Sequence, residues 1–181
     1  MSAKQGIGSN KIKAKRLCLL GILSCVCLIF GFIESLIPFG TIAPGVKIGL
    51  ANSVALTLVL FGDIKGAFAV NITRIILSSL LFSSPSTLIF ALPAGVCSLF
   101  VGALFSKIPA LSGVGIGVIS AFVHNIVQIL VAYFLLGSAV FYYLPFLLVS
   151  ALISGGLIGI ICNYFSKKLK TNKTFYGIIS F

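Results

Sequence analysis

Residues 17–37 read LCLLGILSCVCLIFGFIESLI, an almost unbroken apolar stretch with a single charged side chain, Glu34. A helix that crosses the hydrocarbon core of a bilayer needs about 20 mostly apolar residues. This stretch is too long for the hydrophobic region of a secretory signal, and it lacks a small-residue cleavage site. It therefore predicts a first membrane span.

The rest of the chain is equally apolar. Of its 181 residues 59% are hydrophobic and 8% are charged, whereas soluble domains carry about 25% charged residues. Glycine, proline and serine, which interrupt helices, separate the apolar stretches. We predict an all-α polytopic membrane protein with six transmembrane helices, near 17–37, 48–61, 64–82, 86–106, 111–136 and 141–165. The expected organisation is a basic N-terminal segment (1–16), one transmembrane domain (17–166) and a basic tail (167–181).

The net charge of +11 is explained by membrane orientation rather than by nucleic-acid binding. Five basic residues precede the first predicted span and four follow the last. Basic residues beside spans mark the cytoplasmic side, where they also meet anionic lipid. We expect both termini in the cytoplasm, the lipid bilayer as a partner, and no nucleic acid.

The second predicted span is unusual because it is short and follows a polar turn. The sequence PGVKIGLAN (44–52) precedes an apolar stretch of about 14 residues, less than a full crossing. A helix that begins below the membrane surface needs partners for its first N–H groups. We expect this helix start and Lys47 to face a ligand.

Seven polar residues within or beside the spans, together with Lys47 of the outer loop, form the predicted binding site, although a central charge costs about 2.5–3.5 kcal/mol to insert. By helix geometry Arg74 lies roughly 13 Å and His124 roughly 20 Å from the cytoplasmic surface. Asn71, Arg74 and Ser78 share one face of their span, within about 60° of arc. His124, Asn125 and Gln128 share one face of theirs, within about 100°. We predict a polar cavity open to the outside, with more positive than negative charge and hence an anionic ligand. The predicted residues are Glu34, Lys47, Asn52, Asn71, Arg74, His124, Asn125 and Gln128.

Structural roles for some of these residues remain open. Asn71 and Asn125 are equally suited to hydrogen bonds between helices. His124 can be a packing residue, and Arg74 can pair with Glu34 for stability alone.

The residue inventory argues against an enzyme. The chain has two carboxylates and one histidine, whereas Mg²⁺-dependent prenyl diphosphate chemistry needs several clustered carboxylates. Zinc sites need several Cys or His ligands, and the cysteines here are spaced for packing. No Walker A motif is present. We expect no cofactor, no metal and no catalytic residue.

The ordered motifs PGVKIGLAN (44–52), TRIILSSLLF (73–82), AFVHNIVQILVAYFLLG (121–137) and YYLPFLLVSALISGGLIGI (142–160) resemble the Gx transporter family, also described as heptaprenyl diphosphate synthase component I. That family is similar to the substrate-binding S components of energy-coupling factor transporters. The resemblance implies an S-component-like bundle in a bacterial plasma membrane. It also implies a vitamin-, flavin- or isoprenoid/quinone-related ligand taken from outside, and a coupling subunit with ATPases.

The synthase description implies an alternative. The chain would then be a non-catalytic membrane subunit for a soluble prenyl synthase that makes the menaquinone side chain, or for a quinone- or flavin-dependent electron-transfer system.

Overall fold

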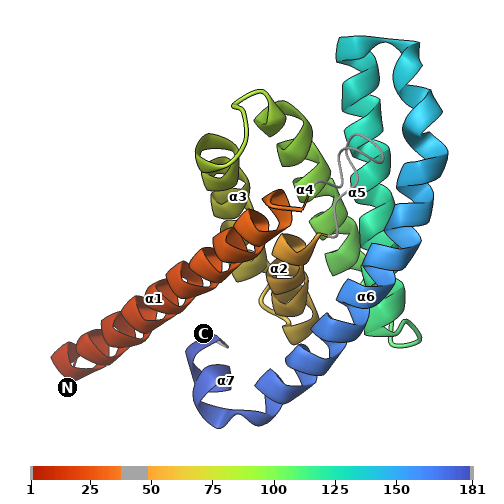
Figure 1. Ribbon diagram of the computed structural model, residues 1–181. Helices are drawn as coiled ribbons and strands as arrows, with labels where there is room; N and C mark the ends of the chain where they lie inside the picture. Colours follow the sequence, from red (N-terminus) through yellow and green to blue (C-terminus); the bar gives the residue numbers. More distant parts are fainter. Residues whose placement is uncertain (1, 38–48, 180–181) are drawn as a thin grey trace.

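The computed structural model describes residues 2–37 and 49–179, and within these ranges it contains helices and no strands. The helices follow one another as an up-and-down bundle (Figure 1). Their bounds are α1 Ser2–Ser35, α2 Leu50–Phe61, α3 Ile64–Leu81, α4 Thr87–Phe105, α5 Gly113–Leu136, the 3₁₀ helix η2 Ser138–Tyr143, α6 Leu144–Thr171 and α7 Lys173–Ile179.

Local sequence explains where these helices begin and end. The Asp63 carboxylate accepts a hydrogen bond from the Gly66 N–H at 2.9 Å and so caps α3. The Ser112 hydroxyl accepts from the Gly115 N–H and caps α5 in the same way. Gly62 and Gly137 have φ values of 115° and 81° where α2 and α5 end, a conformation that favours glycine.

Among the described residues, five helices are long and apolar enough to cross a membrane, and by length and composition the chain fits a membrane protein. Their candidate spans are Lys13–Ser35, Ile64–Leu81, Thr87–Phe105, Gly113–Leu136 and Ser138–Thr171. The remaining predicted span, 48–61, corresponds to α2, which has 12 residues and is about 18 Å long at 1.5 Å per residue. Its shortness agrees with the sequence, and six crossings remain a prediction.

The short helix α2 lies at the centre of the bundle. It packs against α1, α3, α4 and α6, and Ala55, Leu58 and Val59 are at most 2% exposed. By contrast, many large apolar side chains of the surrounding helices are exposed, as expected of lipid-facing surfaces. Helix α2 is thus shielded from lipid by its neighbours.

Helices α5 and α6 meet along rows of small residues. A Cβ added at Gly117 would lie 2.6 Å from the Gly155 carbonyl oxygen and 2.7 Å from the Gly159 Cα. Such close approach needs glycine on both helices. Gly113 and Gly117, which both face α6, therefore serve helix packing.

Two helices extend beyond their predicted spans. Helix α1 continues back through the basic segment to Ser2, and α6 continues to Thr171. Neither helix breaks at the predicted domain boundaries 16/17 and 166/167, so that division remains a prediction. Charged residues ended the predicted spans because they are excluded from lipid, but they do not end a helix.

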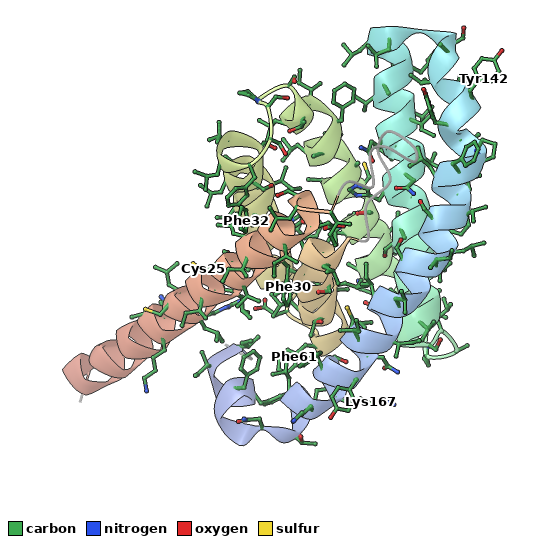
Figure 2. The ribbon with its side chains drawn as sticks, viewed as in Figure 1. Cys25, Phe30, Phe32, Phe61, Tyr142 and Lys167 are labelled. Atoms are coloured by element: carbon green, nitrogen blue, oxygen red, sulfur yellow. The ribbon has the colours of Figure 1, made fainter. Side chains whose placement is uncertain are left out.

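Both ends of the chain lie on one side of the bundle (Figure 1). There α7 folds back so that Phe175 and Tyr176 contact Phe61, with ring centroids 5.7 and 5.8 Å apart. Arg16 pairs with Asp63 at 2.7 Å on the same side. Lys167 lies toward the same side, near the C-terminal end of α6 (Figure 2). Tyr142 lies at the opposite end of the α5–α6 pair, where the two helices are connected (Figure 2).

Candidate functional site

A polar cavity of about 120 Å³ lies beside the start of α2, where Gly49 and Asn52 line it. Parts of α1 through α6 contribute to its wall. Six of the eight predicted residues line it: Glu34, Asn52, Arg74, His124, Asn125 and Gln128. Residues from helices far apart in the sequence therefore converge here, although their role in binding stays a prediction. Lys47 lies outside the described residues.

Arg74 is held by neutral partners. Its Nη2 donates to the Asn52 Oδ1 at 2.7 Å and to the Asn71 Oδ1 at 3.0 Å. Its Nε is buried and makes no hydrogen bond with the described residues. The guanidinium thus keeps an unused donor, and its positive charge is not cancelled by the amide oxygens that orient it.

Glu34 occupies the same wall but turns to a different partner. Its carboxylate accepts a hydrogen bond from the Gly49 N–H, just before the start of α2. Among the described residues, the ion pair between Arg16 and Asp63 is the only one within 4.0 Å. Glu34 thus meets the start of α2, whose role in ligand binding stays a prediction, and Arg74 forms no ion pair with Glu34 within 4.0 Å.

Asn71 and Asn125 make the hydrogen bonds between helices that the sequence left open. The Asn71 Nδ2 donates to the Gly95 carbonyl of α4 at 3.1 Å. The Asn125 Nδ2 donates to the Leu147 carbonyl of α6 at 2.6 Å. Asn71 lies behind the main cavity and orients Arg74, whereas Asn125 also lines the cavity. Both residues therefore position helices around the site.

The sequence analysis missed most of the hydroxyl groups in the wall. It placed Ser78 on the face of Arg74, but serine is common in membrane helices and often bonds to its own backbone, as Ser78 does to the Ile75 carbonyl. The signal that would have found the others is their clustering around the α3–α4 turn. The hydroxyl-bearing lining residues are Ser78, Ser79, Ser83, Thr87 and Ser154.

A smaller cavity of about 40 Å³ continues from the first toward the middle of the bundle. The two cavities share Asn52, Ala121, His124 and Ile158. The Ser120 hydroxyl lines the smaller one, is buried, and has no hydrogen-bond partner in the described structure. A space of this size suits a single water molecule, which occupies about 30 Å³ in the liquid.

The groups that line the cavity are mostly hydrogen-bonding groups. No three His, Cys, Asp or Glu side chains of residues 2–37 and 49–179 lie close enough to hold a metal ion. Both carboxylates, Glu34 and Asp63, accept hydrogen bonds at helix starts. What converges on the cavity is one guanidinium, the Glu34 carboxylate, several amides, an imidazole and hydroxyl groups.

Comparison with protein families gives a match over residues 23–165 to heptaprenyl diphosphate synthase component I. The chain belongs to this family. The matched range extends from the second half of α1 through most of α6 and contains every residue that lines the polar cavity. The name of the component I family describes one part of a synthase and implies partner subunits. Comparisons with curated proteins and with solved structures gave no match.

Proposed function

We propose that this component I protein is a non-catalytic, membrane-embedded binding subunit that takes a compact anionic group into the cavity around Arg74. One observation carries the proposal: a buried arginine lines a polar cavity, has a spare donor, and is oriented by amides rather than by a carboxylate. Arginine in such a setting suits carboxylate and phosphate ligands.

The size of the cavity favours a compact group. Its volume of about 120 Å³ equals about four water molecules at 30 Å³ each. Pockets for drug-sized ligands measure about 300–1,000 Å³. A phosphate or carboxylate, alone or as the head of a larger vitamin-, flavin- or isoprenoid-related molecule, fits this volume better than a complete flavin or quinone ring system.

The distribution of basic residues supports entry from outside. Lys65 lies in the first turn of α3, two residues after the Asp63 that pairs with Arg16, and Lys107 lies in the α4–α5 connection. The α2–α3 and α4–α5 connections lie at the same end of the bundle as the termini (Figure 1). Basic flanks mark the cytoplasmic side. The cavity, whose rim includes Ser83 and Thr87 at the α3–α4 turn, then opens outward. A coupling subunit with ATPases would release the ligand inward, as in S components.

Anion binding by the purified protein tests this proposal. In mild detergent we would titrate inorganic phosphate, inorganic diphosphate and acetate into wild type and Arg74→Gln. Hydrogen bonds to a charged group contribute about 1.5–3 kcal/mol, so we expect affinity to fall by about tenfold or more. The control is Lys107→Gln, which removes the same charge from an exposed position between α4 and α5, away from the cavity. Its affinity for the anions should equal that of wild type.

The outcomes separate binding from folding. The proposal requires Arg74→Gln to purify with a wild-type elution profile while it loses affinity. Wild-type affinity in this variant would refute the Arg74 site. If Arg74→Gln aggregates, Arg74→Lys supplies the answer, because it keeps the positive charge and should retain part of the affinity.

The family name favours a second candidate, an anchor for a soluble prenyl synthase subunit. In that case the polar cavity would be dispensable and the exposed cytoplasmic side would bind the partner. Gentle purification from native membranes, followed by mass spectrometry, distinguishes the two. A recovered synthase with an unchanged yield in Arg74→Gln supports the anchor, whereas a recovered coupling subunit or bound small anion supports the binding subunit.

A further inference from the structure

A side crevice of about 80 Å³ adjoins the Arg74 cavity. The two spaces share four residues, Glu34, Arg74, Ser78 and Ser83. Arg74 therefore lines both spaces. The remaining wall of the crevice consists of Gly31 and Ser35 of α1, Ala51 of α2, and Phe82 at the end of α3.

The crevice leads to the lateral surface of the bundle, between α1 and α3. Ser35, Phe82 and Ser83 at its rim are exposed, and the rings of Phe32 and Phe82 lie 5.2 Å apart across the two helices. Phe32 is placed near the end of α1 that meets the bundle (Figure 2).

The surface around this rim is apolar. Leu36 is 66% exposed and Leu81 is 63% exposed. Such side chains on a membrane helix face lipid tails. The crevice thus joins the cavity that holds Arg74 to the surface where lipid lies.

We propose that the ligand is an amphiphilic anion with a single apolar chain: its head binds Arg74, and its chain leaves through the crevice between α1 and α3. This inference rests on the proposed anion site. The crevice supplies what the compact cavity lacks, which is a route for the rest of a larger molecule. The chemistry is a phosphate- or carboxylate-type head on a hydrocarbon or isoprenoid chain, dissolved or drawn from the membrane.

The size of the crevice limits the chain. Its volume of about 80 Å³ is less than three water molecules at about 30 Å³ each. Chain carbons can pass one behind another, whereas two chains or a fused ring system exceed this space. Only the first few methylenes contact the crevice, and the rest of the chain lies in lipid.

Two homologous series of probes test the inference: alkyl phosphates and alkyl carboxylates from one to six carbons, titrated into the purified protein. Each methylene transferred from water into an apolar crevice should tighten binding about fourfold. We expect the affinity of one series to rise at least tenfold from the one-carbon to the six-carbon probe.

Gly31→Leu is designed to fill the crevice and leave the head site intact. A Cβ at Gly31 has Ala51 Cβ as its nearest neighbour, 3.8 Å away, so a side chain can start there without a clash. Gly31→Leu should bind the one-carbon probe as wild type and lose the rise with chain length. Gly21→Leu is the matched control on the same helix, because its Cβ meets nothing within 4 Å; it should keep the rise. Ser35→Trp, at the exposed rim, replaces Gly31→Leu if that variant does not purify.

The possible results separate this inference from the proposed function. Affinities that do not change with chain length in wild type would overturn the inference and leave the anion site standing, provided that Arg74→Gln still weakens the one-carbon probe. An equal rise in Gly31→Leu, Ser35→Trp and Gly21→Leu would also overturn it, because detergent partitioning acts on all variants alike. If Arg74→Gln binds both series as wild type, both proposals fail. Once the rise is established, mass spectrometry of the protein from native membranes identifies the source: a retained chain-bearing anion indicates the lipid phase, and its absence indicates uptake from solution.

Discussion

At the scale of single residues, the charge of the cavity depends on the side chains that orient Arg74. Asn52 and Asn71 each offer the guanidinium a neutral oxygen. A carboxylate in the same place would hold the guanidinium equally well and neutralise it. The difference between an amide and a carboxylate of the same shape therefore decides whether an anion gains from binding here.

Asn52→Asp tests this difference with almost no change in volume. The new carboxylate would lie where Asn52 Oδ1 accepts from Arg74 at 2.7 Å. We expect phosphate affinity to fall at least tenfold, while the thermal midpoint in detergent stays the same or rises. Asn52→Ala is the control, because it removes the hydrogen bond without adding charge and should cost less affinity. An Asn52→Asp protein that binds phosphate as wild type would contradict the proposed role of Arg74.

The polar residues of the cavity were predictable because each is costly in lipid, so hydropathy and helix geometry alone select them. Two details were not predictable. The hydroxyls of Ser79 and Thr87 cost too little in a membrane helix to mark a site. The partner of Glu34 depends on how α1 meets the start of α2, which the spacing of residues along either helix does not reveal.

At the scale of helices, the close contact between α5 and α6 is the place where the described packing can be tested most directly. The cavity residues Asn125 and Ser154 lie on these two helices. Any separation of the helices would lengthen the hydrogen bond from Asn125 to the Leu147 carbonyl. The glycine rows therefore also set the width of the site.

Gly117→Ala should destabilise the protein, since its Cβ would lie 2.6 Å from a backbone oxygen of α6. Overpacking of this kind costs about 1–3 kcal/mol, which would appear as a lower thermal midpoint in detergent. Gly156→Ala is the matched control on α6, because its Cβ meets nothing within 4 Å. Alanine favours a helix over glycine, so the control should be neutral or slightly stabilising. Equal midpoints for both variants would show that the contact is looser than described.

Helix bounds were predicted well where the helix ends together with its apolar segment. Predicted span 64–82 corresponds to Ile64–Leu81, and 86–106 corresponds to Thr87–Phe105. Prediction was poorer at α1 and α6, because hydropathy locates the part in lipid and carries no information about a helix that continues into water. Helix α7 was missed for the same reason, since Lys173–Ile179 lies in the basic tail beyond the last predicted span.

At the scale of the whole molecule, the proposed orientation can be checked by labelling. Ser86 lies in the α3–α4 turn and Ala110 in the α4–α5 turn, at opposite ends of α4, and both are exposed. With the exposed cysteines Cys18, Cys25 and Cys97 replaced by alanine, Ser86→Cys should react with an impermeant thiol reagent in intact cells. Ala110→Cys should react only after permeabilisation. The reverse pattern would place the cavity on the cytoplasmic side and overturn entry from outside.

The placement of Arg74 also bears on how the protein is made. The span Ile64–Leu81 has a mean hydropathy of 1.4, the lowest of the five long spans, since it carries both Asn71 and Arg74. A lone arginine near the bilayer centre costs about 2.5–3.5 kcal/mol at the translocon. Arg74 donates to the Asn52 oxygen of α2, the helix before α3. Asn71 donates to the Gly95 carbonyl of α4, the helix after α3. We therefore expect α3 to be held at the translocon until α4 has been synthesised, so that the binding cavity forms during insertion rather than after it.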